Sequence, residues 1–255
     1  MKKWLIALAA LVILLVAGVI ILLFSLNSIV EKAVNTEGPK ITETSVHLDK
    51  ADISLFSGRG VFSGFTVGNP AGFSGSHAAT VDSISVALDT GTVFKDVVIV
   101  RNVTVDGPEL VYELGKDTSN FDVLLKNIRN YADRNEHKES VASAASDKSE
   151  DNASKKKVII DELVIRNAKA TLLVPLLKFT VHVPLPEIRL TDIGRKESGT
   201  TFARTALIVA TEVSRKLAEA TAEQTKHMGS VLLKNGEKAE DKAKNLLKEG
   251  LKLFK

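Results

Sequence analysis

The chain has 255 residues, a formal net charge of +3, 44% hydrophobic residues and 5% aromatic residues. So small a net charge does not favour nucleic acid as a partner, because nucleic acid is bound by clustered lysine and arginine. The chain contains no cysteine, which excludes disulfides, thiolate catalysis and cysteine-ligated zinc or iron–sulfur clusters. The length allows one or two domains with a sizeable core.

The first apolar segment, Trp4 to Leu26, contains no charged residue. At about 1.5 Å per residue it is long enough to cross a hydrocarbon core of roughly 30 Å with some tilt. We therefore predict a single transmembrane helix, anchored by Trp4, Leu8, Leu15, Ile20 and Leu26. Lys2 and Lys3 precede it, which favours a cytoplasmic N-terminus and export of the remaining chain. The alternative is a cleaved signal peptide, but the apolar run exceeds about 7–15 residues and no small-x-small cleavage site follows it.

Beyond a short amphipathic stretch, Ser28 to Val34, the apolar residues alternate with polar ones, as in strands with one polar face. Val97 to Val105 and Glu109 to Leu114 are predicted as two strands joined by the turn signal Asp106-Gly107-Pro108. Further strand candidates are Val81 to Asp89, Val158 to Val174, Leu177 to Val183 and Pro186 to Gly194.

The segment from Ser54 to Gly75 holds six of the sixteen glycines of the chain. A dinucleotide-binding loop needs a strand before G-x-G-x-x-G and a helix after it. Here Gly58-Arg59-Gly60 is followed by the strand-like run Val61 to Val67, and Pro70 then biases Asn69 away from helix. We therefore interpret these glycines as turn residues between short twisted strands.

A short repeat relates residues 102–113 to residues 162–173. Val103, Val105, Leu110 and Tyr112 correspond in pattern to Leu163, Ile165, Ala170 and Leu172. Each unit is interpreted as strand, turn and strand, so that two copies would extend one sheet by repeated hairpins. A chance resemblance between two ordinary hairpins is the alternative.

Helices are predicted in three places. The first is short, capped by Ser119 or Asn120 and ending near Tyr131. The second has apolar residues from Ala206 to Ala220 at three- and four-residue intervals, and the third is a lysine-rich helix over Glu237 to Lys255. Between the first helix and the later strands, residues 134–157 are rich in charge, serine and alanine, and are predicted to form a flexible loop.

No catalytic, metal-binding or cofactor-binding residues are predicted. The five histidines are scattered, and no two of them are three or four residues apart. Ser74 lies in Gly72-Phe73-Ser74-Gly75-Ser76, which is not the G-x-S-x-G pattern of a nucleophile elbow. The chain is not expected to be an enzyme.

The chain resembles the AsmA-like family of Gram-negative envelope proteins. The residues that carry the resemblance are the N-terminal anchor, Val46 to Phe73, Ile84 to Glu113, Ser119 to Ile128 and Leu185 to Gly194. The resemblance implies an inner-membrane protein whose periplasmic β-sheet curls into an apolar groove, with a role in phospholipid transport or outer-membrane assembly. With about eight or nine strands about 4.8 Å apart, the sheet would span roughly 40 Å, which is short for a bridge between two membranes.

The predicted fold is α+β and mainly antiparallel: a transmembrane helix, a curled elongated sheet and C-terminal amphipathic helices. The predicted regions are 1–27 (cytoplasmic stub and membrane helix), 28–133 (sheet with a short helix), 134–157 (charged loop), 158–200 (continued sheet) and 201–255 (helices). The candidate apolar groove consists of Ile84, Val86, Leu88, Val103, Val105, Leu110, Tyr112, Leu163 and Ile165.

Two functions remain open from the sequence. In the first, the chain is a single-pass inner-membrane protein with its bulk in the periplasm, and phospholipid acyl chains lie along the apolar sheet face. In the second, the terminal helices close that face into a core, and the lysine-rich final helix docks an envelope partner or anionic lipid. The partners expected are thus the membrane, phospholipid and envelope proteins.

Overall fold

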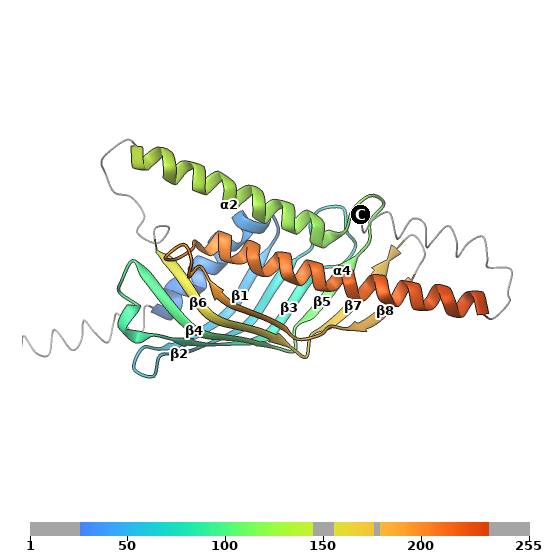
Figure 1. The fold of residues 1–255 in the computed structure, drawn as a ribbon, viewed down its shortest axis with the longest axis horizontal. Coiled ribbons are helices and arrows are strands. Elements are labelled where there is room, and N and C mark those ends of the chain that lie inside the picture. Colours follow the sequence, from blue (N-terminus) through green and yellow to red (C-terminus); the bar gives the residue numbers. More distant parts are fainter. Residues whose placement is uncertain (1–25, 145–155, 176–178, 235–255) are drawn as a thin grey trace, which may run out of the picture.

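A computed structural model describes residues 26–144, 156–175 and 179–234 (Figure 1). The strands are β1 (Val46–Ser54), β2 (Arg59–Gly68), β3 (His77–Leu88), β4 (Val97–Asp106), β5 (Glu109–Glu113), β6 (Lys157–Arg166), β7 (Lys169–Val174), β8 (Phe179–Pro184) and β9 (Ile188–Ile193). The helices are one over residues 26–42, a short turn η1 (Thr90–Thr92), α2 (Asn120–Ala144) and α4 (Phe202–Lys234).

Several predicted features lie outside the described residues. These are the anchor residues Trp4, Leu8, Leu15 and Ile20, and the lysine-rich helix over residues 237–255. Leu26 is the first described residue and is helical, within the helix described over residues 26–42. Among the described residues, none of the helices has both the length and the apolar character needed to cross a membrane.

The nine strands form one mixed sheet with mostly antiparallel neighbours, as the sequence predicted. Its parallel pairs are β4 with β6 and β5 with β7. The prediction that the sheet curls was wrong. The sheet stays open, with β1 at one edge and β8 and β9 at the other, because helices cover its apolar face and the sheet does not have to fold over on itself.

The internal repeat is real, but its units are not hairpins. The two units pair with each other as parallel strands. The register is the same before and after the interruption: Val103 lies opposite Leu163, and Tyr112 lies opposite Leu172. Each unit is a single long strand with an interruption at a residue of positive φ, which is +67° at Gly107 and +55° at Asn167. The turn signal therefore marks a local break in a strand that continues in the same direction.

This arrangement makes the sheet narrower than predicted. β4 continues into β5, β6 into β7, and β8 into β9. The first pair of strands lies beside β3, the second lies beside the first, and the third lies beside the second. The sheet is therefore six strands wide, and at about 4.8 Å between strands it measures roughly 24 Å across. The described sheet is therefore narrower than the roughly 40 Å expected from nine separate strands.

The interruptions keep one face apolar along the whole sheet. In an uninterrupted strand, residues on one face recur at every second position. On β4 and β5, however, the apolar positions change from Val103 and Val105 to Leu110 and Tyr112, while the register with β3 stays unbroken: Val105 pairs with Ile84 and Leu110 pairs with Ala79. The change falls at Gly107, whose φ is +67°. β6 and β7 make the same change at the same level.

The helix over residues 26–42 covers the edge strand β1. Three side chains, each four residues apart, point from one helix face to the backbone of β1. Asn27 Oδ1 accepts from Ile53 N at 2.9 Å, Glu31 Oε1 accepts from Ala51 N at 2.7 Å, and Asn35 Oδ1 accepts from Leu48 N at 2.7 Å. Since an uncovered edge strand would accept another strand, this helix protects that edge of the sheet.

The helices α2 and α4 pack against each other above the sheet (Figure 1). Ser119 is the N-cap of α2: its hydroxyl accepts from Asp122 N at 3.1 Å, and the Asp122 carboxylate accepts from Ser119 N. α2 runs to Ala144, well beyond the predicted end at residue 131. Arg204 of α4 forms ion pairs with Asp133 and Glu136, which holds this extension beside α4.

Candidate functional site: the apolar face of the sheet

The nine residues of the candidate groove lie on one face of the sheet, but they differ in exposure. Leu110, Tyr112, Leu163 and Ile165 are buried. The other five are half-buried and lie on two adjacent strands, β3 and β4; we call them the β3–β4 patch. Its members are Ile84, Val86, Leu88, Val103 and Val105.

The buried residues are sealed by the two long helices. Phe121 and Leu124 of α2 and the fully buried Leu217 of α4 belong to the same cluster as the sheet residues. The rings of Tyr112 and Phe121 are 6.0 Å apart between centroids. Burial is the main cause that raises the pKa of Tyr112 above its ordinary value, which is consistent with an apolar environment around this ring. This part of the face is a protein core.

The β3–β4 patch is covered less completely. After Leu124, α2 turns its apolar residues Ile128 and Ala132 toward α4 and toward Ile41, in a second cluster separate from the sheet. On the neighbouring strand, Gly60 lies directly opposite Val86 and contributes no side chain. Both features leave the apolar side chains of the patch partly accessible.

The opposite face of the sheet is polar and ion-paired. Glu162 accepts from Asn102 Nδ2 at 2.9 Å and is also bound by Arg189. At the strand interruptions, Asp106 accepts from Asn167 Nδ2 at 2.7 Å and from Arg166. The bond from Asn167, followed by that from Arg166, lowers the pKa of Asp106, so the stability that these bonds contribute is lost as the pH falls through the pKa of the folded state. Apolar ligands are not expected on this face.

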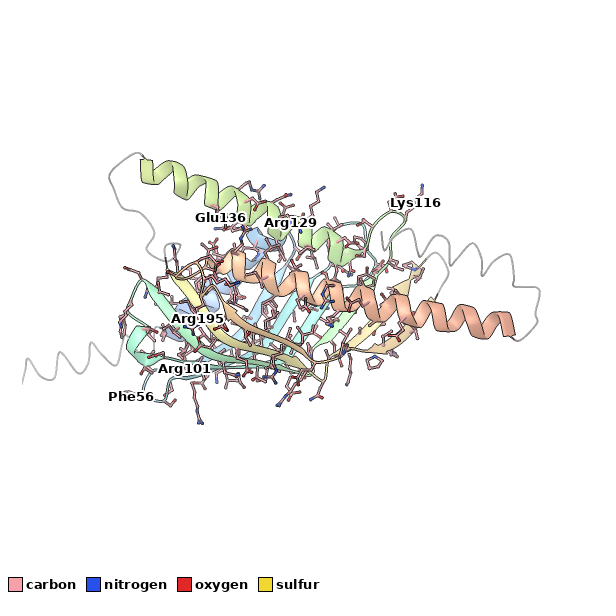
Figure 2. The ribbon with its side chains drawn as sticks, in the orientation of Figure 1. Phe56, Arg101, Lys116, Arg129, Glu136 and Arg195 are labelled. Carbon is pink, nitrogen blue, oxygen red and sulfur yellow. The ribbon has the colours of Figure 1, made fainter. Side chains whose placement is uncertain are left out.

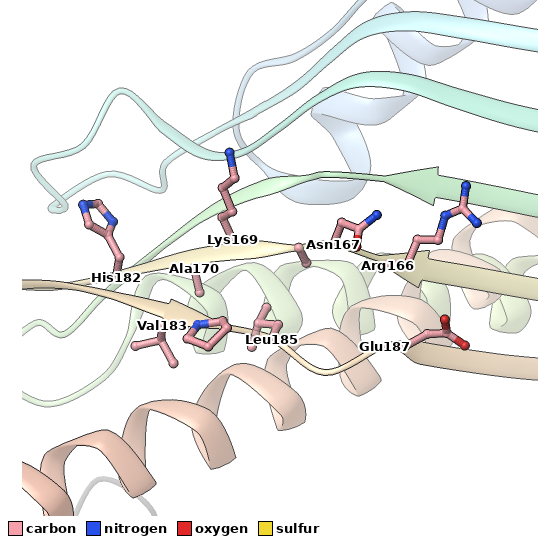
Figure 3. Close-up of a pocket in the computed structure, with 10 residues that line it drawn as sticks. Arg166, Asn167, Lys169, Ala170, His182, Val183, Leu185 and Glu187 are labelled. Atoms are coloured by element: carbon pink, nitrogen blue, oxygen red, sulfur yellow. The ribbon is translucent and has the colours of Figure 1, made fainter.

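An open pocket lies at the edge formed by β7 and β8 (Figure 3). Figure 3 shows Val183 and Leu185 on the side of α4, and Lys169 and His182 on the other side of the strands. The Lys169 ammonium lies 3.7 Å from the Glu109 carboxylate. The Lys169 charge therefore has a partner within the chain, although this exposed ion pair contributes little.

A buried polar cluster, missed in the sequence, holds the glycine-rich segment to the sheet. Glu113 is buried, and its carboxylate accepts from Ser74 N at 2.8 Å, from Ser74 Oγ at 2.9 Å and from Gly75 N at 3.1 Å. Asn120, also buried, accepts from Glu113 N and donates to Asn69 Oδ1 at 2.7 Å. The sequence signal was a glutamate at an otherwise apolar strand end, just before the helix cap.

We expect Glu113→Ala to lower the free energy of unfolding by about 2–3 kcal/mol, because the backbone N–H groups of residues 74 and 75 lose a charged acceptor. Glu109→Ala is the matched control on the same strand, since its carboxylate is exposed and its ion pair contributes little. Chemical unfolding followed by circular dichroism measures both. Equal, small losses in the two variants would contradict a structural role for Glu113.

The described residues contain no group of three or more His, Asp or Glu side chains placed to hold a metal ion. Ser74 donates its hydroxyl to Glu113, so this serine is engaged in holding its loop. The apolar face is thus the feature of the described chain that most resembles a binding surface.

The described chain thus combines an edge helix, an open interrupted sheet and a helical cover over the apolar face of that sheet. The AsmA family model matches residues 1–174, which is more than half of the chain, and the chain therefore belongs to the AsmA family. Members are cell-envelope proteins, generally non-enzymatic, and membership implies a general role in envelope biogenesis and lipid transport. No curated protein matches the chain.

Proposed function

We propose that this chain is an inner-membrane protein, anchored by its N-terminal segment, that handles phospholipid in the periplasm by holding acyl chains against the β3–β4 patch. The observation that supports this proposal most strongly is the patch itself. Five apolar side chains on two adjacent strands stay half-buried, although four of them, all but Ile84, pack against the edge of the core cluster that α2 and α4 seal.

The energetics of such a surface suit a carrier. Each methylene removed from water contributes about 0.8 kcal/mol, so ten methylenes of an acyl chain would contribute about 8 kcal/mol relative to water. A bilayer offers the same chain a similar gain. A chain lying on the patch keeps part of its surface in water, so it gains less there than in the bilayer. A lipid can therefore leave the patch again without a chemical step or a dedicated polar site.

The alternation of the strands gives a sharp test. Adjacent residues of a strand point to opposite faces, so Val86 and Ser85 differ in face while sharing the same backbone environment. A photoreactive benzoylphenylalanine at position 86 of the full chain, in living cells, should form phospholipid adducts. The same residue at position 85 should form several-fold fewer. Equal yields at the two positions would contradict the proposal.

A second function is favoured by one observation. Leu110, Tyr112 and Leu172 are buried beneath α2 and α4, as in a closed core that holds no ligand. In that case the chain would be an anchored adaptor that binds an envelope partner through its exposed surfaces. The cross-link at position 86 separates the two functions, because an adaptor with a closed core would yield no phospholipid adduct there.

A further inference from the structure

The large apolar side chains that the described residues expose are all at one end of the sheet. Phe56 is 88% exposed, Phe94 is 78% exposed and Phe202 is 62% exposed. The remaining ones are Ile29, Val61 and Ile208. We call this end the anchor end. It comprises the start of the helix over residues 26–42, the β1–β2 turn, the loop between η1 and β4, and the first turns of α4.

The direction of the strands brings these segments together. β1 and β3 run toward the anchor end, and β2 and β4 run away from it. The β1–β2 turn and the loop after β3 are in contact: Gly58 O accepts from Leu88 N at 2.6 Å, and a Cβ on Gly58 would lie 3.1 Å from the Thr90 side chain. The segments that carry Phe56 and Phe94 are therefore neighbours in space.

The same end receives the chain from the predicted membrane span. Asn27 Oδ1 accepts from Ile53 N, near the end of β1, so residue 27 of the helix over residues 26–42 lies at the anchor end. The predicted span ends at Leu26, one residue earlier. The exposed phenylalanines thus lie on the side of the domain from which the chain would leave the membrane.

We infer that the anchor end rests on the bilayer, with Phe56 and Phe94 inserted at its interface. Isolated exposed apolar residues are common on protein surfaces, but a group gathered at one end marks an interaction site. Aromatic and aliphatic side chains at an interface gain free energy by burial at the boundary of the acyl chains. This inference depends on the predicted span, and it holds whether or not the β3–β4 patch carries lipid.

The anchor end carries both positive and negative charges, so burial of its apolar side chains is the main contribution to the inferred membrane binding. Lys95 and Arg59 are exposed there, but so is Asp96, and Asp89 forms an ion pair with Arg101. Attraction to anionic lipid is therefore not the main contribution. The inference accordingly requires insertion into zwitterionic bilayers as well.

The absence of cysteine from the chain allows a direct test with single labels. Ser57→Cys and Lys95→Cys place a fluorophore beside Phe56 and Phe94 while leaving both phenylalanines intact. Lys116→Cys is the control, since Phe56 and Lys116 lie at opposite ends of the sheet (Figure 2). The full chain is reconstituted into phosphatidylcholine vesicles that contain lipids brominated near the head group, which quench fluorophores at the interface.

We expect strong quenching at positions 57 and 95 and little at position 116. Adding Phe56→Ser to the Ser57→Cys chain should reduce quenching at position 57 several-fold. Quenching no greater at 57 and 95 than at 116 would overturn the inference and would point instead to a protein partner at this end. Flotation of the vesicles in high salt tests the span independently, and a chain that fails to float would also overturn the inference. The phospholipid adduct at position 86 reports separately on the proposed function.

Discussion

Val103→Asp is expected to remove most phospholipid cross-linking at position 86. Val103 lies directly opposite Val86 on the apolar face, so the carboxylate would stand where an acyl chain is proposed to lie. A charge facing hydrocarbon costs about 2.5–3.5 kcal/mol even where relaxation is possible. Since about 1.4 kcal/mol corresponds to a tenfold change in an equilibrium, we expect the adduct yield to fall by at least about tenfold.

Thr104→Asp is the matched control for this variant. Thr104 is the next residue of β4 and faces the polar side, where its hydroxyl donates to Asn102 at 2.9 Å. We expect the adduct yield in that variant to equal that of the unsubstituted chain. Val103→Thr, which keeps the size of the side chain, covers the case in which the aspartate unfolds the protein, and should give an intermediate yield. Unchanged yields in Val103→Asp and Val103→Thr would exclude the β3–β4 patch as the lipid site.

The largest effect on stability is expected for Leu217→Ala. Leu217 of α4 is fully buried against the sheet cluster, and removal of such a side chain leaves a cavity that the surroundings fill only in part. Losses of about 2–5 kcal/mol are typical for buried leucine, and complete burial places this residue in the upper half of that range. Denaturant unfolding of the full chain in detergent, followed by circular dichroism, measures the change.

Ile208→Ala serves as the control on the same helix, because Ile208 is exposed and should cost less than about 1 kcal/mol. The comparison asks whether α4 is a fixed part of the core or a removable cover. A loss at Leu217 as small as that at Ile208 would mean that α4 binds the sheet weakly. The sealed half of the apolar face would then also be open to lipid.

Local patterns predicted the strands well where alternation is strong. β4 begins at Val97 and β5 at Glu109, both as predicted, because one side of each strand faces a core and the other faces water. The end of α2 was predicted too early. Its second half is charged and packs on α4 through Ile128, Ala132 and the ion pairs of Arg204, and these contacts are long-range ones that a local pattern does not contain.

The partners of the strands could not be predicted for a related reason. Asp106-Gly107-Pro108 has the composition of a turn, and a reversing hairpin and a strand interruption both need a residue of positive φ there. The choice between them depends on whether β5 pairs with β4 or with β3 and β7. In the folded chain the long strand β3 pairs with both β4 and β5, so the segment between β4 and β5 is a strand interruption and not a hairpin turn.

The candidate site was predicted in part. Alternation identified which residues share the apolar face, and their registers place Val86 beside Val103 and Leu110 beside Ala170. Which of them the helices bury depends on which residues of α2 contact the sheet. Phe121 and Leu124 pack in the sheet cluster, whereas Ile128 packs in the separate cluster with α4. That the β3–β4 patch holds a lipid stays a proposal.

The most direct measurement is the mass spectrum of whatever becomes linked to a photoreactive residue at position 86 in cells. We expect a phospholipid adduct there, absent from the chain labelled at position 85. A spectrum containing only peptides of α2, α4 or the helix over residues 26–42 would mean that the protein closes this face with its own helices, and the proposed lipid-handling function would be wrong.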